Sequence, residues 1–206
     1  MRIAKIAPLS LILAGLAAFG TSQAQENLDW YLGAGLGDAN FDSGVTSVTG
    51  TASLDEDDTA TKIFAGVSVN PNLSIELQYS DLGEAKLSGN TGDRFNLNGT
   101  TFEFTSDNAQ ISAEAESIGA SVLGVLPVTE RFQAFGRLGL HTWDATATST
   151  TPEQREELED DGTDLFFGVG VEIALIHEAS LRIEAEQYEL DDEDVTSVGG
   201  SLLYRF

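Results

Sequence analysis

Hydrophobic and polar residues alternate along residues 164–190, in two runs separated by a break at residues 175–179. Alternation with a period of two is typical of a strand with two different faces, and two such runs joined by a tight turn predict an antiparallel hairpin. If the turn centres on His177, Glu172 lies opposite Arg182, so one face carries small residues and paired opposite charges. The other face is apolar and consists of Leu165, Phe167, Val169, Val171, Ile173, Leu181 and Ile183.

Six further runs alternate in the same way, so the sequence predicts eight strands in all. Together with the hairpin they occupy residues 29–41, 61–69, 73–82, 117–126, 132–143, 164–174, 180–190 and 195–206. Three of the connections are tight turns, at residues 70–72, 127–131 and 175–179. Three others are long and polar, at residues 42–60, 83–116 and 145–162, and residues 191–194 form a short acidic connection.

The order of these connections places all the tight turns at one end of the sheet and all the acidic segments at the other. This is the layout of bacterial outer-membrane barrels, which have an even number of antiparallel strands. Because lipid cannot satisfy backbone polar groups, strands cross a bilayer only in a closed barrel. The sequence therefore predicts an all-β fold, an eight-stranded antiparallel up-and-down transmembrane β-barrel. A periplasmic or secreted β-sandwich, soluble without detergent, is the alternative fold.

The chain of 206 residues is strongly acidic, with 34 Asp and Glu against 10 Lys and Arg and a formal net charge of −24. This balance argues against nucleic acid as a partner, because phosphate is bound through Lys and Arg, and against docking on anionic lipid through a basic patch. Beyond residue 24, no apolar run is long enough for a transmembrane helix. The sequence contains no Cys, so no disulfide framework is expected.

Residues 1–24 have the features of a signal peptide. Arg2 and Lys5 precede an apolar run at residues 6–19, and small residues follow at positions 22 and 24. We expect cleavage after Ala24, export, and a mature chain in which residues 25–206 form one barrel domain. An uncleaved N-terminal membrane anchor is the alternative.

The alternating runs resemble the OmpA-like outer-membrane barrel family over residues 28–206. The strongest likeness is FFGVGVEIALIHEASLRIEAEQYEL, with an echo in IFAGVSVNPNLSIELQYSDL. The last residues, LLYRF, are similar to the carboxy-terminal signal that the barrel assembly machinery reads, with Leu202, Tyr204 and Phe206 at alternate positions. The resemblance implies a small outer-membrane protein in contact with lipid and lipopolysaccharide. No peptidoglycan-binding domain of the larger family members is expected after the barrel.

Charged residues on the predicted inner face are the first candidates for function. They are Lys62, Glu76, Arg137, Glu172, Arg182, Glu184, Glu186 and Arg205. Charges enclosed in a narrow lumen are costly unless they are paired and hydrogen-bonded. We expect a static polar network that holds the barrel closed. A porin-like path for ions or small solutes, gated by ion pairs that exchange partners, remains the alternative.

Acidic clusters are expected at the outer rim, at residues 55–58, 156–161 and 191–194. Carboxylate oxygens are ligands of divalent cations, which also bridge lipopolysaccharide, but none of these runs has the spacing of a calcium loop. A solvated, repulsive surface is favoured, and cation binding stays open. We expect no cofactor and no metal site.

Catalysis is the remaining alternative, because some barrels of this size modify lipid A. His141, Thr142 and Asp144 come at the outer end of a predicted strand, but a serine nucleophile next to the histidine is absent. We therefore expect no enzyme activity. Trp143 could lie in the outer aromatic belt or point inward, and FNLNGTTFEF could form a hairpin above the membrane. The interpretation that the sequence favours is a structural role in envelope integrity and surface presentation.

Overall fold

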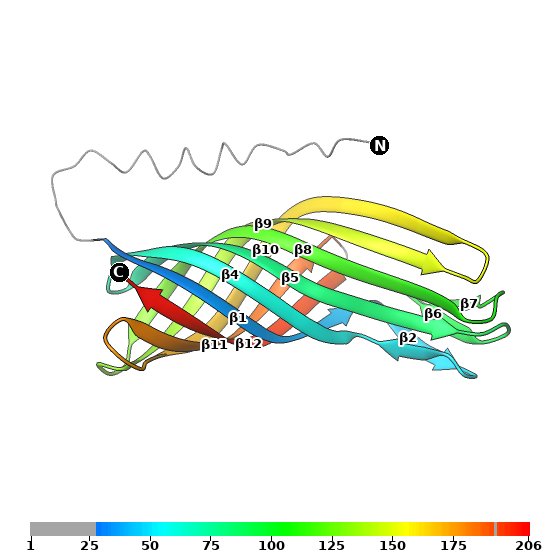
Figure 1. Cartoon of the computed structure of the whole chain (residues 1–206), viewed down its shortest axis with the longest axis horizontal. Coiled ribbons are helices and arrows are strands. Elements are labelled where there is room, and N and C mark those ends of the chain that lie inside the picture. Colours follow the sequence, from blue (N-terminus) through cyan, green and yellow to red (C-terminus); the bar gives the residue numbers. More distant parts are fainter. Residues whose placement is uncertain (1–27, 192) are drawn as a thin grey trace.

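The computed structural model describes residues 28–191 and 193–206, so the signal peptide expected over residues 1–24 lies outside the described residues. Eight of the twelve described strands close into one antiparallel ring (Figure 1). They are β1 (Asp29–Asp42), β4 (Asp57–Asn70), β5 (Leu73–Gly89), β8 (Ala109–Pro127), β9 (Phe132–Thr150), β10 (Arg155–Ala174), β11 (Ala179–Leu190) and β12 (Glu193–Arg205). Pairing of β1 with β12, and of β5 with β8, closes the ring, as predicted. Within the described ranges, no helix is long and apolar enough to cross a membrane.

The β10–β11 hairpin has the register expected from the alternation. Glu172 lies opposite Arg182 and Val171 lies opposite Ile183, and the Leu175 amide donates to the Ala179 carbonyl oxygen across the turn, at 2.9 Å. Because side chains alternate between faces, one register fixes the orientation of every residue in both strands.

The two ends of the barrel differ as predicted. The tight turns lie together with the start of β1 and the end of β12, and we call this the turn end (Figure 1). The opposite end, the loop end, carries the four short strands β2 (Val45–Thr49), β3 (Ser53–Asp55), β6 (Arg94–Leu97) and β7 (Thr100–Glu103). Strands β2, β6 and β7 form a second antiparallel sheet, so the segment FNLNGTTFEF does contain a hairpin.

The long polar connections are much more regular than the sequence predicted. Strands β9 and β10 run on past the predicted strand ends, so most of residues 145–162 is a hairpin and not a loop. In it, acidic residues pair with threonines, Glu159 with Thr146 and Glu157 with Thr148. Threonine favours strands, so the pairing continues through this segment. Both faces of the hairpin are in water here, so the sequence shows no hydrophobic alternation.

The outward face of the ring carries a continuous apolar band. On β10 it spans residues 165–173, and Val169 at its centre is 66% exposed. Leu36, Ile63, Leu138 and Leu202 extend the band around the barrel, and all four are exposed. Above the band on the loop-end side, Asp161, Asp144, Glu116 and Asp81 form one row across β10, β9, β8 and β5. An apolar belt bounded by charge is the surface of a barrel that sits in lipid.

Inward glycines make room for large rings in the lumen. The ring of Phe64 packs with Tyr31 and Leu203 in a buried cluster, and a methyl group added at Gly33 would lie 2.2 Å from Phe64 Cζ. We expect Gly33→Ala to lower the free energy of unfolding by about 1–3 kcal/mol, because the ring must leave its position. Urea unfolding from lipid vesicles measures the loss.

Gly124→Ala is the matched control for this prediction. Its new methyl group would meet its nearest neighbour, the Gly136 carbonyl oxygen, only at 4.0 Å. The change in stability should stay within about 0.5 kcal/mol. Equal losses in the two variants would mean that crowding against Phe64 is not the cause.

Candidate functional site in the barrel lumen

The structure places all eight inward charges in one network in the middle of the lumen. Four cationic and four carboxylate side chains take part, so their formal charges balance. Lys62 pairs with Glu184 and Glu186, Arg137 with Glu76, Glu184 and Glu186, Arg182 with Glu76 and Glu172, and Arg205 with Glu172. These residues come from six different strands, β4, β5, β9, β10, β11 and β12. The network therefore ties together strands that are not neighbours in the sheet.

Glu76 is the centre of the network and is completely buried. One of its carboxylate oxygens accepts from Arg137. The other accepts from Arg182 Nη1 at 2.8 Å and from the hydroxyl group of Tyr31 at 3.0 Å. This carboxylate compensates two guanidinium groups, although Nε of Arg137 and Nε of Arg182 have no hydrogen-bond partner among the described residues. Removing one partner from such a buried group is costly because it leaves a buried charge uncompensated.

Neutral polar and aromatic side chains complete the network, and the sequence analysis did not select them. Gln78 accepts from Arg137 and donates to the hydroxyl group of Tyr188 at 2.8 Å. The guanidinium group of Arg182 lies 4.8 Å from the centroid of the Phe64 ring. Gln78 lies two residues after Glu76 on β5, so both side chains point inward. This position is the sequence signal that could have identified Gln78.

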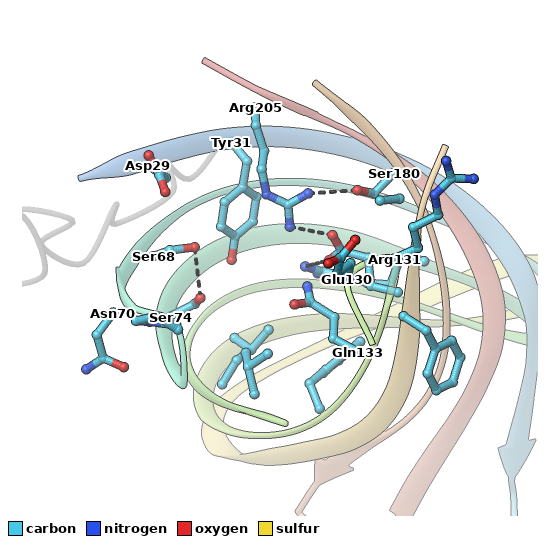
Figure 2. Close-up of a pocket in the computed structure, with 18 of the residues that line it drawn as sticks. Asp29, Tyr31, Ser68, Asn70, Ser74, Glu130, Arg131, Gln133, Ser180 and Arg205 are labelled. Carbon is cyan, nitrogen blue, oxygen red and sulfur yellow. Dashed lines mark hydrogen bonds and ion pairs between the residues drawn. The ribbon is translucent and has the colours of Figure 1, made fainter. Parts of the chain in front are cut away.

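Toward the turn end, the network borders an open cavity of about 670 Å³. Arg205 lies at its wall, donating to Ser180 Oγ at 2.7 Å and to Glu172, while the hydroxyl group of Ser74 donates to that of Ser68 at 3.3 Å (Figure 2). Arg131, Glu130 and Gln133 approach the same space from the β8–β9 turn and the start of β9 (Figure 2). This end of the lumen is polar and accessible to water.

Toward the loop end, a hydrophobic layer covers the network. Eleven buried residues form it, and each of the eight ring strands supplies at least one: Ala39, Phe41, Ala60, Leu82, Ala85, Ala115, Trp143, Phe166, Tyr188, Leu190 and Val195. The rings of Phe166 and Tyr188 stack at 5.4 Å between centroids and 5° between planes. Trp143 thus points inward, and its Nε1 donates to Asp164 at 2.7 Å. On each strand that has both kinds of residue, this layer is nearer the loop end than the charges.

His141 lies within the same part of the lumen, 1% exposed, and does not meet the partners that the sequence suggested. Thr142 and Asp144 are exposed, and Thr142 points to the opposite face because it is the next residue of the strand. His141 instead pairs with Ser117, with 2.9 Å between Nδ1 and Oγ. Its Nε2 donates to the Glu189 carbonyl oxygen at 2.9 Å, because a carbonyl oxygen can only accept. When the ring is neutral, Nδ1 accepts from the serine hydroxyl. Both side chains are buried, and the His141 ring lies edge-on to Phe166 and Tyr188.

The carboxy-terminal residues Leu202, Tyr204 and Phe206 all face outward and are exposed. The rings of Tyr204 and Phe206 contact each other at 5.4 Å between centroids, and the Phe206 amide donates to the Trp30 carbonyl oxygen at 3.0 Å. The three residues therefore form an apolar stripe on the seam between β12 and β1.

The loop end is a folded unit with its own small core. Leu87, Phe104 and Ala109 are buried there, and Val48, Ala52, Leu54, Phe95 and Ile111 pack against them. Asp93 fixes the connection before β6, because its carboxylate accepts from the Thr51 amide and hydroxyl groups and from the Asn90 amide. Throughout the described residues, no group of three or more His, Cys, Asp or Glu is arranged to hold a metal ion.

The hydrogen bonds from Thr51 and Asn90 lower the pKa of Asp93. A lowered carboxyl pKa stabilises the folded loop end above the ordinary Asp pKa of about 4, and the effect is lost as the pH falls through the lowered value. We therefore expect the amides of Thr51 and Asn90 to lose protection from hydrogen exchange between about pH 5 and pH 2. In Asp93→Asn the protection should be weaker and independent of pH. Unchanged protection in the parent protein at pH 2 would contradict the assignment.

Comparison with known proteins agrees with this architecture. The family model described as the OmpA-like transmembrane domain matches residues 24–197. The chain belongs to the OmpA-like family. It is an outer-membrane protein, so its apolar band lies among lipid and lipopolysaccharide, and the expected family and location are confirmed.

Curated OmpA-like relatives include outer membrane protein A of Salmonella typhi and of Shigella flexneri. Each is 28% identical over 193 residues, which cover 93% of this chain and 49% of the relative. The chain thus spans about half the length of the curated relatives it matches. Among solved structures, Ail of Yersinia pestis covers 87% of this chain and 99% of its own, at 17% identity and a TM-score of 0.57. Neisserial surface protein A covers 86% of this chain and 97% of its own, at 13% identity and a TM-score of 0.53. These two likenesses show the fold.

Proposed function

We propose that this OmpA-like protein is a closed structural barrel that contributes to envelope integrity and presents a folded β-structure on the cell surface, without conduction or catalysis. The observation that carries this proposal is the hydrophobic layer in the lumen, to which all eight ring strands contribute. Ions cross apolar, dehydrated layers only at a high free-energy cost. Above that layer, the β2–β6–β7 sheet and its small core offer an ordered surface to the outside.

Purified protein in planar bilayers tests the closed lumen. We expect no discrete conductance steps, because the stacked rings of Phe166 and Tyr188 and the indole of Trp143 belong to a buried apolar layer that would have to be crossed. The double variant Phe166→Ala, Tyr188→Ala should raise conductance if this layer is the barrier. Regular steps from the parent protein would reject the proposal.

A narrow, gated pore is the second candidate, and the water-accessible cavity at the turn end favours it. In that case Glu186, which pairs with both Lys62 and Arg137, would exchange partners during opening. The pore hypothesis predicts conductance that changes when Arg137 or Glu172 is neutralised.

An enzyme acting on lipid A is the third candidate, and the Ser117–His141 pair is the only observation in its favour. Both side chains are at most 2% exposed, and a lipid would have to reach them through the hydrophobic layer. A mass spectrum of lipid A from a host strain that changes on expression, and reverts with His141→Ala, would support it.

Two partner assignments also belong to this proposal. The exposed stripe of Leu202, Tyr204 and Phe206 suits recognition by the barrel assembly machinery after signal-peptide cleavage at Ala24. The row of Asp81, Glu116, Asp144 and Asp161 faces the zone of lipopolysaccharide, where divalent cations would relieve the repulsion between directly opposed carboxylates. For the first assignment, we expect Phe206→Ala to assemble more slowly than the parent protein. For the second, we expect Ca²⁺ to raise the thermal stability of the parent protein more than Na⁺ does at equal ionic strength.

A further inference from the structure

One long sheet edge at the loop end has no neighbouring strand. Residues 155–163 of β10 pair with β9 on one side, from Arg155 opposite Thr150 to Thr163 opposite Thr142. On the other side, the first residue of β10 paired with β11 is Phe166, opposite Tyr188. Strand β11 ends at Leu190, which the same register places opposite Asp164, so residues 155–163 lie beyond it. Figure 1 shows the β9–β10 hairpin running on past the ends of β11 and β12. Among the described residues, this stretch of backbone therefore has one open edge.

An open edge can accept a further strand through its unpaired backbone groups. This edge is accessible, because residues 155–161 are exposed on both faces of the sheet. It is also long, whereas β3, which stands at one end of the sheet order and pairs only with β5, has just three residues. Leu158, 74% exposed, adds an apolar side chain in the middle of the edge.

Charge decides which strand fits. The edge carries five carboxylates, at Glu156, Glu157, Glu159, Asp160 and Asp161, and a single cation, Arg155, which is already paired with Glu157 at 2.7 Å. A second copy of this chain would bring the same carboxylates face to face, and like charges opposite each other destabilise a strand pair. The neighbouring row of Asp144, Glu116 and Asp81 extends the negative surface across the sheet.

We propose that residues 155–163 of β10 form a docking edge that binds a basic, extended segment of another protein outside the cell by strand addition. The partner backbone pairs with the open edge of β10, and its Lys or Arg side chains pair with the carboxylates. This inference rests on the proposed role in surface presentation, and it names the class of partner that the presented surface would bind.

The test uses the full mature protein in nanodiscs of neutral phosphatidylcholine, so that the lipid itself does not attract a basic probe. The probe is a synthetic peptide of the same length as the edge, alternating Lys with Thr. We expect saturable binding by fluorescence anisotropy, and an infrared amide I shift to the sheet position for a peptide labelled with ¹³C at its carbonyl groups. Binding should weaken at least about tenfold when alternate peptide nitrogens are methylated, because these can no longer donate.

Two triple variants separate the edge from the general charge. Glu157→Gln, Glu159→Gln, Asp161→Asn should weaken binding about tenfold. The matched control Asp81→Asn, Glu114→Gln, Glu116→Gln removes three charges from strands that have neighbours on both sides, and should weaken it less than about threefold. Equal effects of the two triple variants would overturn the docking edge. The same holds if the methylated peptide, or a peptide alternating Glu with Thr, bound as tightly as the unmethylated Lys–Thr peptide.

A dimer of the protein alone that dissociates in Leu158→Pro would assign the edge to a second copy. Conductance in planar bilayers tests the closed barrel separately, so either result can fail without the other.

Discussion

Replacing Glu76 with alanine is expected to lower the free energy of unfolding by about 3–5 kcal/mol. The substitution removes the carboxylate that compensates both Arg137 and Arg182, and leaves two guanidinium groups buried with fewer partners. It also removes the acceptor of the Tyr31 hydroxyl group. Urea unfolding from lipid vesicles measures the change, and loss of heat-modifiable migration on a gel reports whether the barrel still closes.

Glu157→Ala is the control for this prediction. Glu157 also pairs with an arginine, Arg155, but both side chains are more than half exposed. Exposed ion pairs contribute about 0–1 kcal/mol, so this variant should unfold almost as the parent does. Glu76→Gln, which keeps an acceptor for Tyr31, should fall between the two. If Glu76→Ala cost no more than Glu157→Ala, the network would not stabilise the closed barrel.

The formal charges of the lumen network sum to zero, so the network does not contribute to the excess negative charge of the chain. The formal net charge is −24, yet the four cations and four carboxylates of the network cancel. The excess is therefore carried outside this network, and the loop end and the rim above the apolar band hold much of it. The paired charges of the interior and the repulsive charges of the outer surface are therefore separate features of the barrel.

Sequence alternation predicted the inward position of every network residue, because a strand has a period of two and the apolar face had to meet lipid. It also predicted the pairing of Glu172 with Arg182, which sit on one hairpin. It could not predict that Lys62 meets Glu184, because these residues lie on β4 and β11, which are separated in the ring by β1 and β12. Contacts across the lumen depend on strand tilt and stagger, which the sequence alone does not specify.

The sequence was less informative where both faces of a strand meet water. Residues 145–162 lack hydrophobic alternation, which predicts a loop, whereas β9 and β10 continue through most of them. The grouping of His141 with Thr142 and Asp144 was wrong for a different reason. It grouped residues that are adjacent in the chain, whereas His141 meets Ser117 from the neighbouring strand and Thr142 points to the other face. In a sheet, the relevant neighbours of a side chain come from cross-strand register.

Val169→Arg is expected to impair assembly of the barrel strongly. Val169 lies at the centre of the apolar stretch of β10, between Gly136 of β9 and Ala185 of β11, and faces lipid. An arginine on the lipid face near the bilayer midplane costs about 2–4 kcal/mol. The yield of heat-modifiable protein after refolding into vesicles measures assembly, and urea unfolding of the assembled fraction measures stability.

Leu158→Arg is the matched control, because Leu158 is an exposed apolar residue of the same strand but lies beyond the apolar band, opposite Ala147 of β9. In water the new charge is solvated, so the free energy of unfolding should change by less than about 0.5 kcal/mol. The difference between the two variants reports the boundary between lipid and water on β10. If both substitutions were tolerated equally, residues 165–173 would not face lipid, and the docking edge at residues 155–163 would have to be placed at a different height above the membrane.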